Sequence, residues 1–163
     1  MTPTTYVYRN DRASQELKSA QLLSLKNATA PDGQEDYQSE INRLKSVIAL
    51  EPECTDPIVF ALLGIALARV NFFECTPYLE KALQYNGQHH TLDDNNAIMH
   101  LIHKYLGLAY LGSYKDRLQE IDESKLAQYY REALRYKDDP KMAIFLGKME
   151  ASLEKKKRAT ERR

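Results

Sequence analysis

Apolar residues recur at the three- and four-residue spacing of α-helices along most of the chain. No segment alternates between apolar and polar residues as a half-buried strand would. The pattern therefore predicts an all-α fold without strands. The expected helices cover residues 13–26, 37–50, 57–70, 76–86 and 95–111, then a segment that ends near 137, and a last one from 140 to 158 that loses its apolar stripe after residue 153.

The clearest prediction is a hairpin of two helices within residues 56–86. Asp56 can cap the first helix, and Pro57 suits its first turn, where the missing N–H would have had no helical partner. Asn71 interrupts the apolar pattern. Thr76, which precedes a proline, repeats the cap-then-proline start and is expected to open the second helix.

A short motif recurs in this hairpin and after it. A Leu-Gly pair stands in three predicted helices, and an Ala-Leu pair stands in two of the helices that follow them. A glycine lets a second helix approach closely, but it costs about 1 kcal/mol of helix propensity relative to alanine, which packing must offset. The motif consists of Leu63, Gly64, Ala82, Leu106, Gly107, Tyr110, Ala133, Leu146 and Gly147.

This motif resembles the tetratricopeptide repeat (TPR), which carries L-G-x-x-Y in one helix and A-x-x-x-F in the next. Leu106, Gly107 and Tyr110 fit the first part in full. The resemblance covers about residues 39–153. It implies three to three and a half antiparallel helical hairpins, stacked as a right-handed solenoid within a domain over residues 13–153.

The chain departs from the repeat in two respects. It has no tryptophan, and the interval from Gly107 to Ala133 is eight residues longer than that from Gly64 to Ala82. The extra residues fall in a charged insertion near 113–123. We expect this insertion to extend the helix that follows it.

Composition sets further bounds. Lys and Arg number 23, as do Asp and Glu, so no global field attracts the chain to nucleic acid or membrane. Charge is nevertheless uneven, because residues 154–163 hold six basic and two acidic residues. We expect this segment to be a basic tail. Residues 1–12 are expected to be a loose arm whose aromatic side chains contact the first helix.

Few features indicate a compartment or a covalent framework. Cys54 and Cys75 form no close-spaced pair, so no disulfide framework or zinc site is predicted. Cys75 is expected to be a packed, unreactive thiol. The sequence starts without a secretory signal and contains no run long enough to span a membrane, which favours a cytoplasmic location.

Signatures of catalysis are absent. No nucleophile elbow, phosphate-binding loop or dinucleotide fingerprint occurs. The histidines are the one cluster that suits a metal, and a metal-dependent enzyme is the least favoured alternative. We expect no metal, no cofactor and no enzymatic activity; the four histidines are His89, His90, His100 and His103.

The remaining candidate for function is a surface. In tetratricopeptide arrays the first helix of each hairpin lines a concave groove that holds a segment of a partner protein. The resemblance assigns to this groove Ala61, Ile65, Ala68, Arg69, Leu101, Lys104, Leu108, Leu111, Ile144, Lys148 and Ala151.

This lining is mostly apolar. Ile65 and Leu108 stand where arrays that clamp a C-terminal carboxylate carry asparagine. We therefore expect a non-enzymatic interaction module, an adaptor or small chaperone, that holds an apolar or amphipathic segment. Two alternatives stay open: the arm or a second copy of the chain covers the groove, or the basic tail binds nucleic acid.

Overall fold

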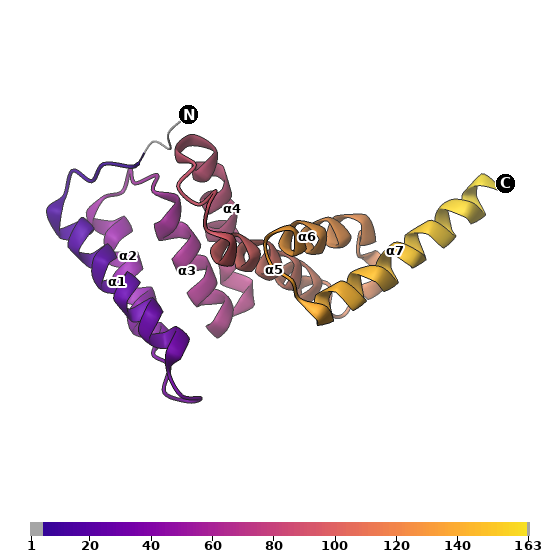
Figure 1. The fold of residues 1–163 in the computed structure, drawn as a ribbon, viewed down its shortest axis with the longest axis horizontal. Coiled ribbons are helices and arrows are strands. Elements are labelled where there is room, and N and C mark those ends of the chain that lie inside the picture. The colour runs from indigo at the N-terminus through magenta and orange to yellow at the C-terminus, as the bar shows by residue number, and fades with distance from the viewer. Residues whose placement is uncertain (1–4, 163) are drawn as a thin grey trace. The chain divides into compact units, whose positions relative to one another are not determined.

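The structure is a computed structural model that describes residues 5–162, with the backbone alone for Phe72. Among these residues it contains helices and no strand, which confirms the all-α prediction (Figure 1). Residues 1–4 of the predicted arm and residue 163 of the predicted tail lie outside the described part. The elements are α1 (Asp11–Thr29), α2 (Tyr37–Leu50), α3 (Pro57–Val70), α4 (Phe72–His89), α5 (Asn96–Ser113), the 3₁₀-helix η1 (Leu118–Glu120), α6 (Glu123–Tyr136) and α7 (Pro140–Glu161).

The chain divides into two compact units, an N-terminal unit up to Asn95 and a C-terminal unit from Asn96. In the N-terminal unit α1 packs on α2, α2 on α3, and α3 on α4. In the C-terminal unit α5 packs on α6, and α6 on α7. None of the described helices is both long and apolar enough to cross a bilayer.

The N-terminal unit is built around α3. Nearly every residue of this helix from Pro57 to Ala68 is buried, because α2 and α4 both cover it. A Cβ atom at Gly64 would lie 2.5 Å from Leu79 Cδ2 of α4. The predicted close approach at Gly64 is therefore confirmed, and it requires the absence of a side chain.

The C-terminal unit repeats this arrangement at Gly107. A Cβ atom there would lie 2.7 Å from a ring carbon of Tyr130 on α6. Gly147 differs, because a Cβ atom would meet nothing within 4 Å. No helix follows α7 in the described residues. The core of this unit consists of Leu126, Ala127, Tyr130, Ala133, Met142, Leu146 and Met149.

Polar side chains set the beginnings of most helices, since an Asn or Asp oxygen accepts hydrogen bonds from the free N–H groups of the first turn. α4 starts earlier than predicted, with Asn71 and not Thr76 as its cap, so Pro77 lies inside the helix. The capping residues are Asn10, Asp36, Asp56, Asn71, Asp122 and Asp139.

The charged insertion does not extend the following helix, so that prediction is wrong. Residues 114–116 form a turn, η1 comes next, and α6 begins only after its cap Asp122. The Asp122 N–H donates to the Tyr110 hydroxyl at 3.1 Å, which ties the insertion back to α5. At the other end, α7 continues without a break through the predicted tail as far as Glu161.

Candidate functional site

The C-terminal unit contains a cavity of about 360 Å³ whose lining is mostly apolar. This volume lies within the range of small-ligand and side-chain pockets. α5, α6 and α7 all contribute to it. The lining residues are Lys104, Leu108, Leu111, Tyr130, Asp139, Lys141, Met142 and Phe145. We call this cavity the apolar pocket.

Helical spacing explains why these residues meet. Lys104, Leu108 and Leu111 lie four and three residues apart, so they share one face of α5. Met142 and Phe145 lie three apart on α7 in the same way. The Phe145 ring, 40% exposed, stands edge-on to the buried Tyr130 ring at 5.6 Å between centroids. Apolar surface is thus left open to solvent beside a well-packed core.

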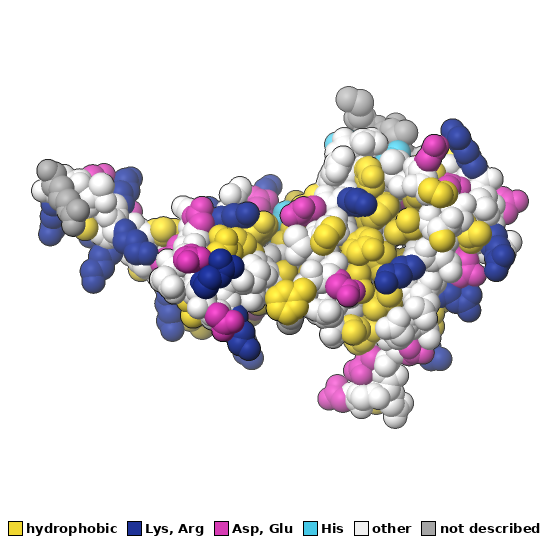
Figure 2. Space-filling model, turned by 180° about the vertical axis from the view of Figure 1, so that it is seen from behind, with side chains coloured by type: hydrophobic (Ala, Val, Ile, Leu, Met, Phe, Trp, Pro, Cys, Tyr) yellow, Lys and Arg dark blue, Asp and Glu magenta, His cyan; other side chains and the backbone are white. Residues whose placement is uncertain are grey.

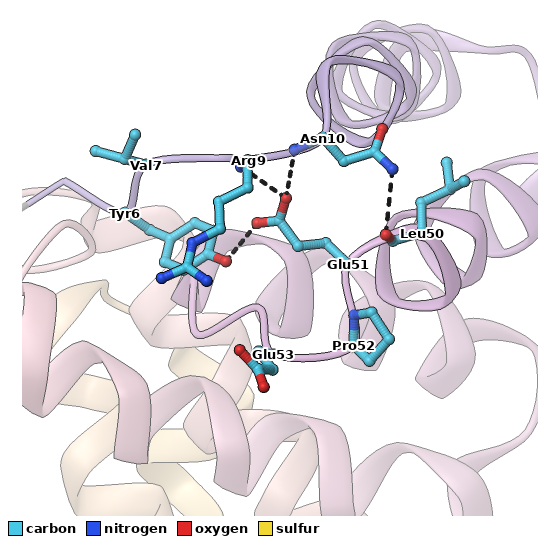
Figure 3. A pocket seen from close by; sticks show the side chains of 8 residues that line it. All are labelled: Tyr6, Val7, Arg9, Asn10, Leu50, Glu51, Pro52 and Glu53. Atoms are coloured by element: carbon cyan, nitrogen blue, oxygen red, sulfur yellow. Dashed lines mark hydrogen bonds between the residues drawn. The ribbon is translucent and has the colours of Figure 1, made fainter.

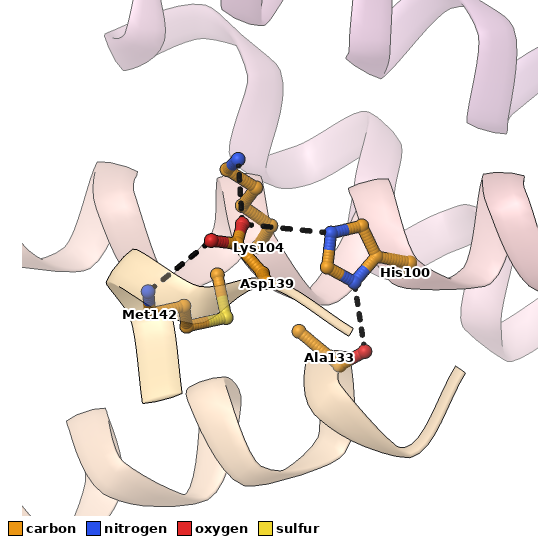
Figure 4. Close-up of polar contacts among 5 residues, drawn as sticks. All are labelled: His100, Lys104, Ala133, Asp139 and Met142. Carbon is orange, nitrogen blue, oxygen red and sulfur yellow. Dashed lines mark hydrogen bonds and ion pairs between the residues drawn. The ribbon is translucent and has the colours of Figure 1, made fainter. Parts of the chain in front are cut away.

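Two of the lining residues, Lys104 and Asp139, belong to a polar junction that also includes His100 (Figure 4). Lys104 Nζ donates to Asp139 Oδ2 at 3.0 Å, and the same carboxylate caps α7 by accepting from the Met142 N–H at 3.2 Å. His100 Nε2 lies 3.9 Å from Asp139 Oδ2. The hydrogen bond from Lys104 is the main reason why the pKa of Asp139 is lowered.

His100 is buried in this junction, at 4% exposure. Its Nδ1 lies 2.8 Å from the Ala133 carbonyl oxygen, so Nδ1 carries a proton and donates it. No described serine, threonine or cysteine side chain lines the pocket. Lys104 and Asp139 bond to each other, while Lys141 is exposed and has no carboxylate of residues 5–162 within ion-pair distance. The junction therefore joins α5, α6 and α7 at one side of the pocket.

The other histidines have separate partners. His103 stacks parallel to Tyr136 at 5.9 Å between ring centroids, and burial lowers its pKa. His89 Nε2 lies 2.9 Å from Thr55 Oγ1, and His90 Nδ1 lies 3.1 Å from Asp93 Oδ2. Among the described residues no group of three or more potential ligands is arranged to hold a metal ion.

The described part of the N-terminal arm, residues 5–10, lies on the loop that joins α2 to α3 (Figure 3). Glu51 accepts a hydrogen bond from the Tyr6 hydroxyl and one each from the N–H groups of Arg9 and Asn10, both at 2.8 Å. The Tyr8 hydroxyl donates to Asp56 at 2.7 Å. We expected the arm to contact the first helix, but its side-chain hydroxyls bond to Glu51 and Asp56 instead.

The hydrogen bonds from the arm affect the pKa values of Glu51 and Asp56. Burial alone would raise the pKa of Glu51, but three hydrogen-bond donors outweigh it and leave that pKa lowered. Burial raises the pKa of Asp56, and the hydrogen bond from Tyr8 offsets only part of this effect. A cavity of about 590 Å³ lies beside Glu51. The arm already supplies three donors to this carboxylate. We call the hydrogen bonds of the arm to Glu51 and Asp56 together the latch.

The predicted groove residues of the N-terminal unit are mostly inaccessible in this structure. Ala61, Ile65 and Ala68 are buried, at 0%, 7% and 3% exposure. Arg69 is exposed, and its guanidinium donates to the Tyr37 hydroxyl at 3.0 Å. A partner could reach the first three only if the helices around α3 moved.

In the C-terminal unit the predicted residues separate into two groups. Lys104, Leu108 and Leu111 come together in the apolar pocket, and Leu101 is half-buried elsewhere on α5. The other group is exposed on α7 outside the pocket lining and consists of Ile144, Lys148 and Ala151.

Sequence reasoning missed the remaining pocket residues. Tyr130 is a buried core residue of α6 that also lines the pocket. Phe145 and Met142 could have been found from their three-residue spacing on α7. Asp139 caps α7, but nothing in the sequence pairs it with Lys104.

Both cysteines are buried, and neither forms a disulfide. Burial raises the pKa of Cys75, which disfavours the reactive thiolate. The prediction of a packed Cys75 is therefore confirmed.

Comparison of the chain with known protein families, with curated proteins and with solved structures yields no match. The case for a function therefore rests on the pocket and on the surface beside it.

Proposed function

We propose that the chain is a non-enzymatic protein-interaction module, an adaptor or small chaperone. Its C-terminal unit holds an apolar or amphipathic segment of another protein. One observation carries this proposal: the apolar pocket leaves side chains of α5 and α7 uncovered beside a complete core, with Phe145 at 40% exposure. Uncovered apolar surface that is concave and rimmed by charged groups is typical of binding sites.

We further propose that the hairpins are degenerate tetratricopeptide-like repeats. The supporting observation is that Gly64 receives Leu79 and Gly107 receives Tyr130 at equivalent places in the motif. Each glycine is preceded by a buried leucine, Leu63 or Leu106. The same contact thus recurs in both units, although the sequences of the receiving helices differ.

The size of the pocket limits what it can contribute alone. One fully buried apolar side chain gains about 1.5–3 kcal/mol, and ordering of the partner reduces this gain. An affinity in the micromolar range needs about 8 kcal/mol. The partner segment must therefore make further contacts next to the pocket.

Leu108→Asp tests the proposal. Peptides of 15–20 residues (about the length of one helix) are selected from a display library with the full chain, and their affinities are measured by fluorescence anisotropy. We expect Leu108→Asp to weaken the selected peptides at least tenfold, because a carboxylate would be placed in the apolar pocket.

Leu118→Asp is the matched control, because Leu118 is an exposed leucine of η1, 60% exposed, that does not line the pocket. Circular dichroism establishes that both variants keep the helix content of the parent. If Leu108→Asp binds the peptides as the parent does, or if Leu118→Asp weakens them equally, the pocket is not the binding site.

A further inference from the structure

Four cations lie at strict seven-residue intervals along α7 and its C-cap residue Arg162. They are all exposed, and none has a carboxylate of residues 5–162 within ion-pair distance. Two other cations of α7 are paired, Lys156 with Glu123 at 2.7 Å and Arg158 with Glu154 at 3.4 Å. Lys157 has no ion pair among the described residues but lies on a different side of the helix. The four unpaired residues, which we call the cationic stripe, are Lys141, Lys148, Lys155 and Arg162.

The stripe occupies one side of the helix. Seven residues fall about 20° short of two full turns, so four positions at this spacing stay within roughly 60° and extend over about 31 Å. The acidic residues of α7, Glu150, Glu154 and Glu161, lie about 80° or more around the helix from every member. Figure 2 shows Lys and Arg side chains gathered toward the C-terminal end of the chain.

The stripe begins at the apolar pocket. Lys141 is one of the pocket residues, and Lys148 lies two turns further along α7. Ile144, at 63% exposure, and Ala151 run beside the stripe on the same side of the helix. An apolar anchoring site is thus continuous with a short apolar strip and a row of unpaired positive charges.

We propose that the segment held by the pocket is part of an acidic amphipathic helix of another protein that lies along α7. One apolar side chain enters the pocket, and Asp or Glu side chains at seven-residue intervals face Lys148, Lys155 and Arg162. This inference rests on the proposed function. It adds two properties of the partner, its negative charge and its seven-residue periodicity. The periodicity follows because two helices that lie side by side share the same axial repeat of about 10.5 Å per seven residues.

Charge complementarity favours this partner over other anions. The chain as a whole has equal numbers of acidic and basic residues, so the attraction is local to α7. Single-stranded nucleic acid is usually held by exposed aromatic rings among the cations, but Tyr130 is buried and Phe145 is the one partly exposed ring in the pocket. An interfacial membrane helix needs a free apolar face, whereas Met142, Leu146 and Met149 are buried in the core.

The test uses the full chain and a designed peptide of three heptads (about 21 residues), with leucines on one face and glutamates at seven-residue intervals. A control peptide carries glutamine in place of each glutamate. At about 50 mM salt we expect the glutamate peptide to bind about tenfold more tightly, with the difference shrinking at high salt.

The decisive variant is Lys148→Glu combined with Lys155→Glu. We expect it to bind the glutamate peptide at least tenfold more weakly than the parent. A peptide with lysine in place of glutamate should recover binding to this variant. The control is Lys45→Glu combined with Lys157→Glu, which changes the net charge equally but places one reversal on α2 and the other on a different side of α7. This control should bind like the parent.

Each outcome decides the matter. If the stripe reversal leaves binding unchanged while Leu108→Asp weakens it, the proposed function stands and the acidic partner is wrong. If neither variant changes peptide binding, both are wrong. If a single-stranded RNA of about 20 nucleotides or a phosphatidylserine vesicle binds more tightly than the glutamate peptide, and the stripe reversal abolishes that binding, the stripe serves nucleic acid or membrane and the inference is overturned.

Discussion

α3 of the N-terminal unit and α7 of the C-terminal unit carry the same Leu-Gly pair in different surroundings. The leucines behave alike, since Leu63 and Leu146 are both buried, at 0% and 7% exposure. The glycines do not. Gly64 is closed off by Leu79 of α4, whereas Gly147 is exposed and has open space around it.

The difference lies in whether another helix covers the glycine. α4 covers the outer face of α3, but no other helix of the C-terminal unit covers the corresponding face of α7 within the described residues. The motif therefore specifies two separate things: a leucine that enters the core and a glycine that can receive another helix. Within residues 96–162 no other helix packs against Gly147 of α7. Ile144 and the cationic stripe therefore stay accessible to a partner.

The largest effect is expected from valine at the two closed glycines. Gly64→Val and Gly107→Val force a branched side chain into Leu79 and Tyr130, and such overpacking lowers the free energy of unfolding by about 1–3 kcal/mol. Thermal unfolding followed by circular dichroism measures this loss as a melting temperature lower by several degrees.

Gly147→Val is the control for these two variants. Nothing lies within 4 Å of its added Cβ, so only the modest helix preference of valine acts there. A melting temperature for Gly147→Val as low as that of Gly64→Val would show that valine destabilises these helices by itself, and the distinction between α3 and α7 would fail.

The next largest effect concerns the latch in the N-terminal unit. Tyr8→Phe keeps the ring but leaves the buried Asp56 without its hydroxyl donor, which is expected to cost about 1–3 kcal/mol. Tyr114→Phe is the control in the C-terminal unit, because the Tyr114 hydroxyl bonds to no described residue while its ring contacts Tyr110. Chemical denaturation measures both, and equal stabilities would mean that the arm does not contribute.

Acid should weaken the C-terminal unit before the N-terminal one. Burial lowers the pKa of His103, so the unfolded chain binds a proton more readily than the folded one. The contribution of His103 to the free energy of unfolding is fully present above the unfolded pKa of about 6.5. It is lost as pH falls through the lowered pKa of the folded state. Asp139 acts in the same direction at lower pH, because its pKa is lowered mainly by Lys104.

In the N-terminal unit the shifts oppose one another. The pKa of Glu51 is lowered, but burial raises the pKa values of Glu40 and Asp56, and a raised pKa favours the folded state in acid. Hydrogen exchange at pH 7 and about pH 5.5, corrected for intrinsic rates, should show reduced protection in α5 and little change in α3. His103→Gln should remove this difference, and a larger loss in α3 would contradict the assignment.

The sequence predicted α2 and α3 with their full bounds, 37–50 and 57–70. For α3 two signals coincide, because Asp56 caps the helix and Pro57 occupies its first turn. The start of α4 was missed because Thr76-Pro77 imitates the same signal inside a helix that Asn71 had already begun. Local propensity does not reveal that the helix continues through this proline.

The sequence predicted only those neighbours in the candidate site that lie on the same helix. Lys104, Leu108 and Leu111 share a face by their spacing, and the pocket contains all three. That Asp139 meets Lys104 depends on how α7 packs, and spacing within one helix carries no information about it. For the same reason the burial of Ile65 could not be foreseen, because it results from α2 and α4 covering α3 from both sides.

The smallest expected effect is a change in the free energy of unfolding that has opposite signs in α3 and α7. Gly147→Ala replaces an exposed glycine in the interior of a helix, adds a Cβ into open space, and should stabilise the C-terminal unit by about 0.5–1 kcal/mol. Gly64→Ala gains the same helix propensity, but its Cβ would lie 2.5 Å from Leu79 Cδ2, so it should destabilise the N-terminal unit.

Urea unfolding of both variants measures the sign of each change in the free energy of unfolding. Because the substitution is identical, propensity cancels in the comparison and the packing of the next helix remains. If both variants were stabilised, Leu79 would yield to the new methyl group at little cost, and the close approach at Gly64 would not be what fixes α4 on α3.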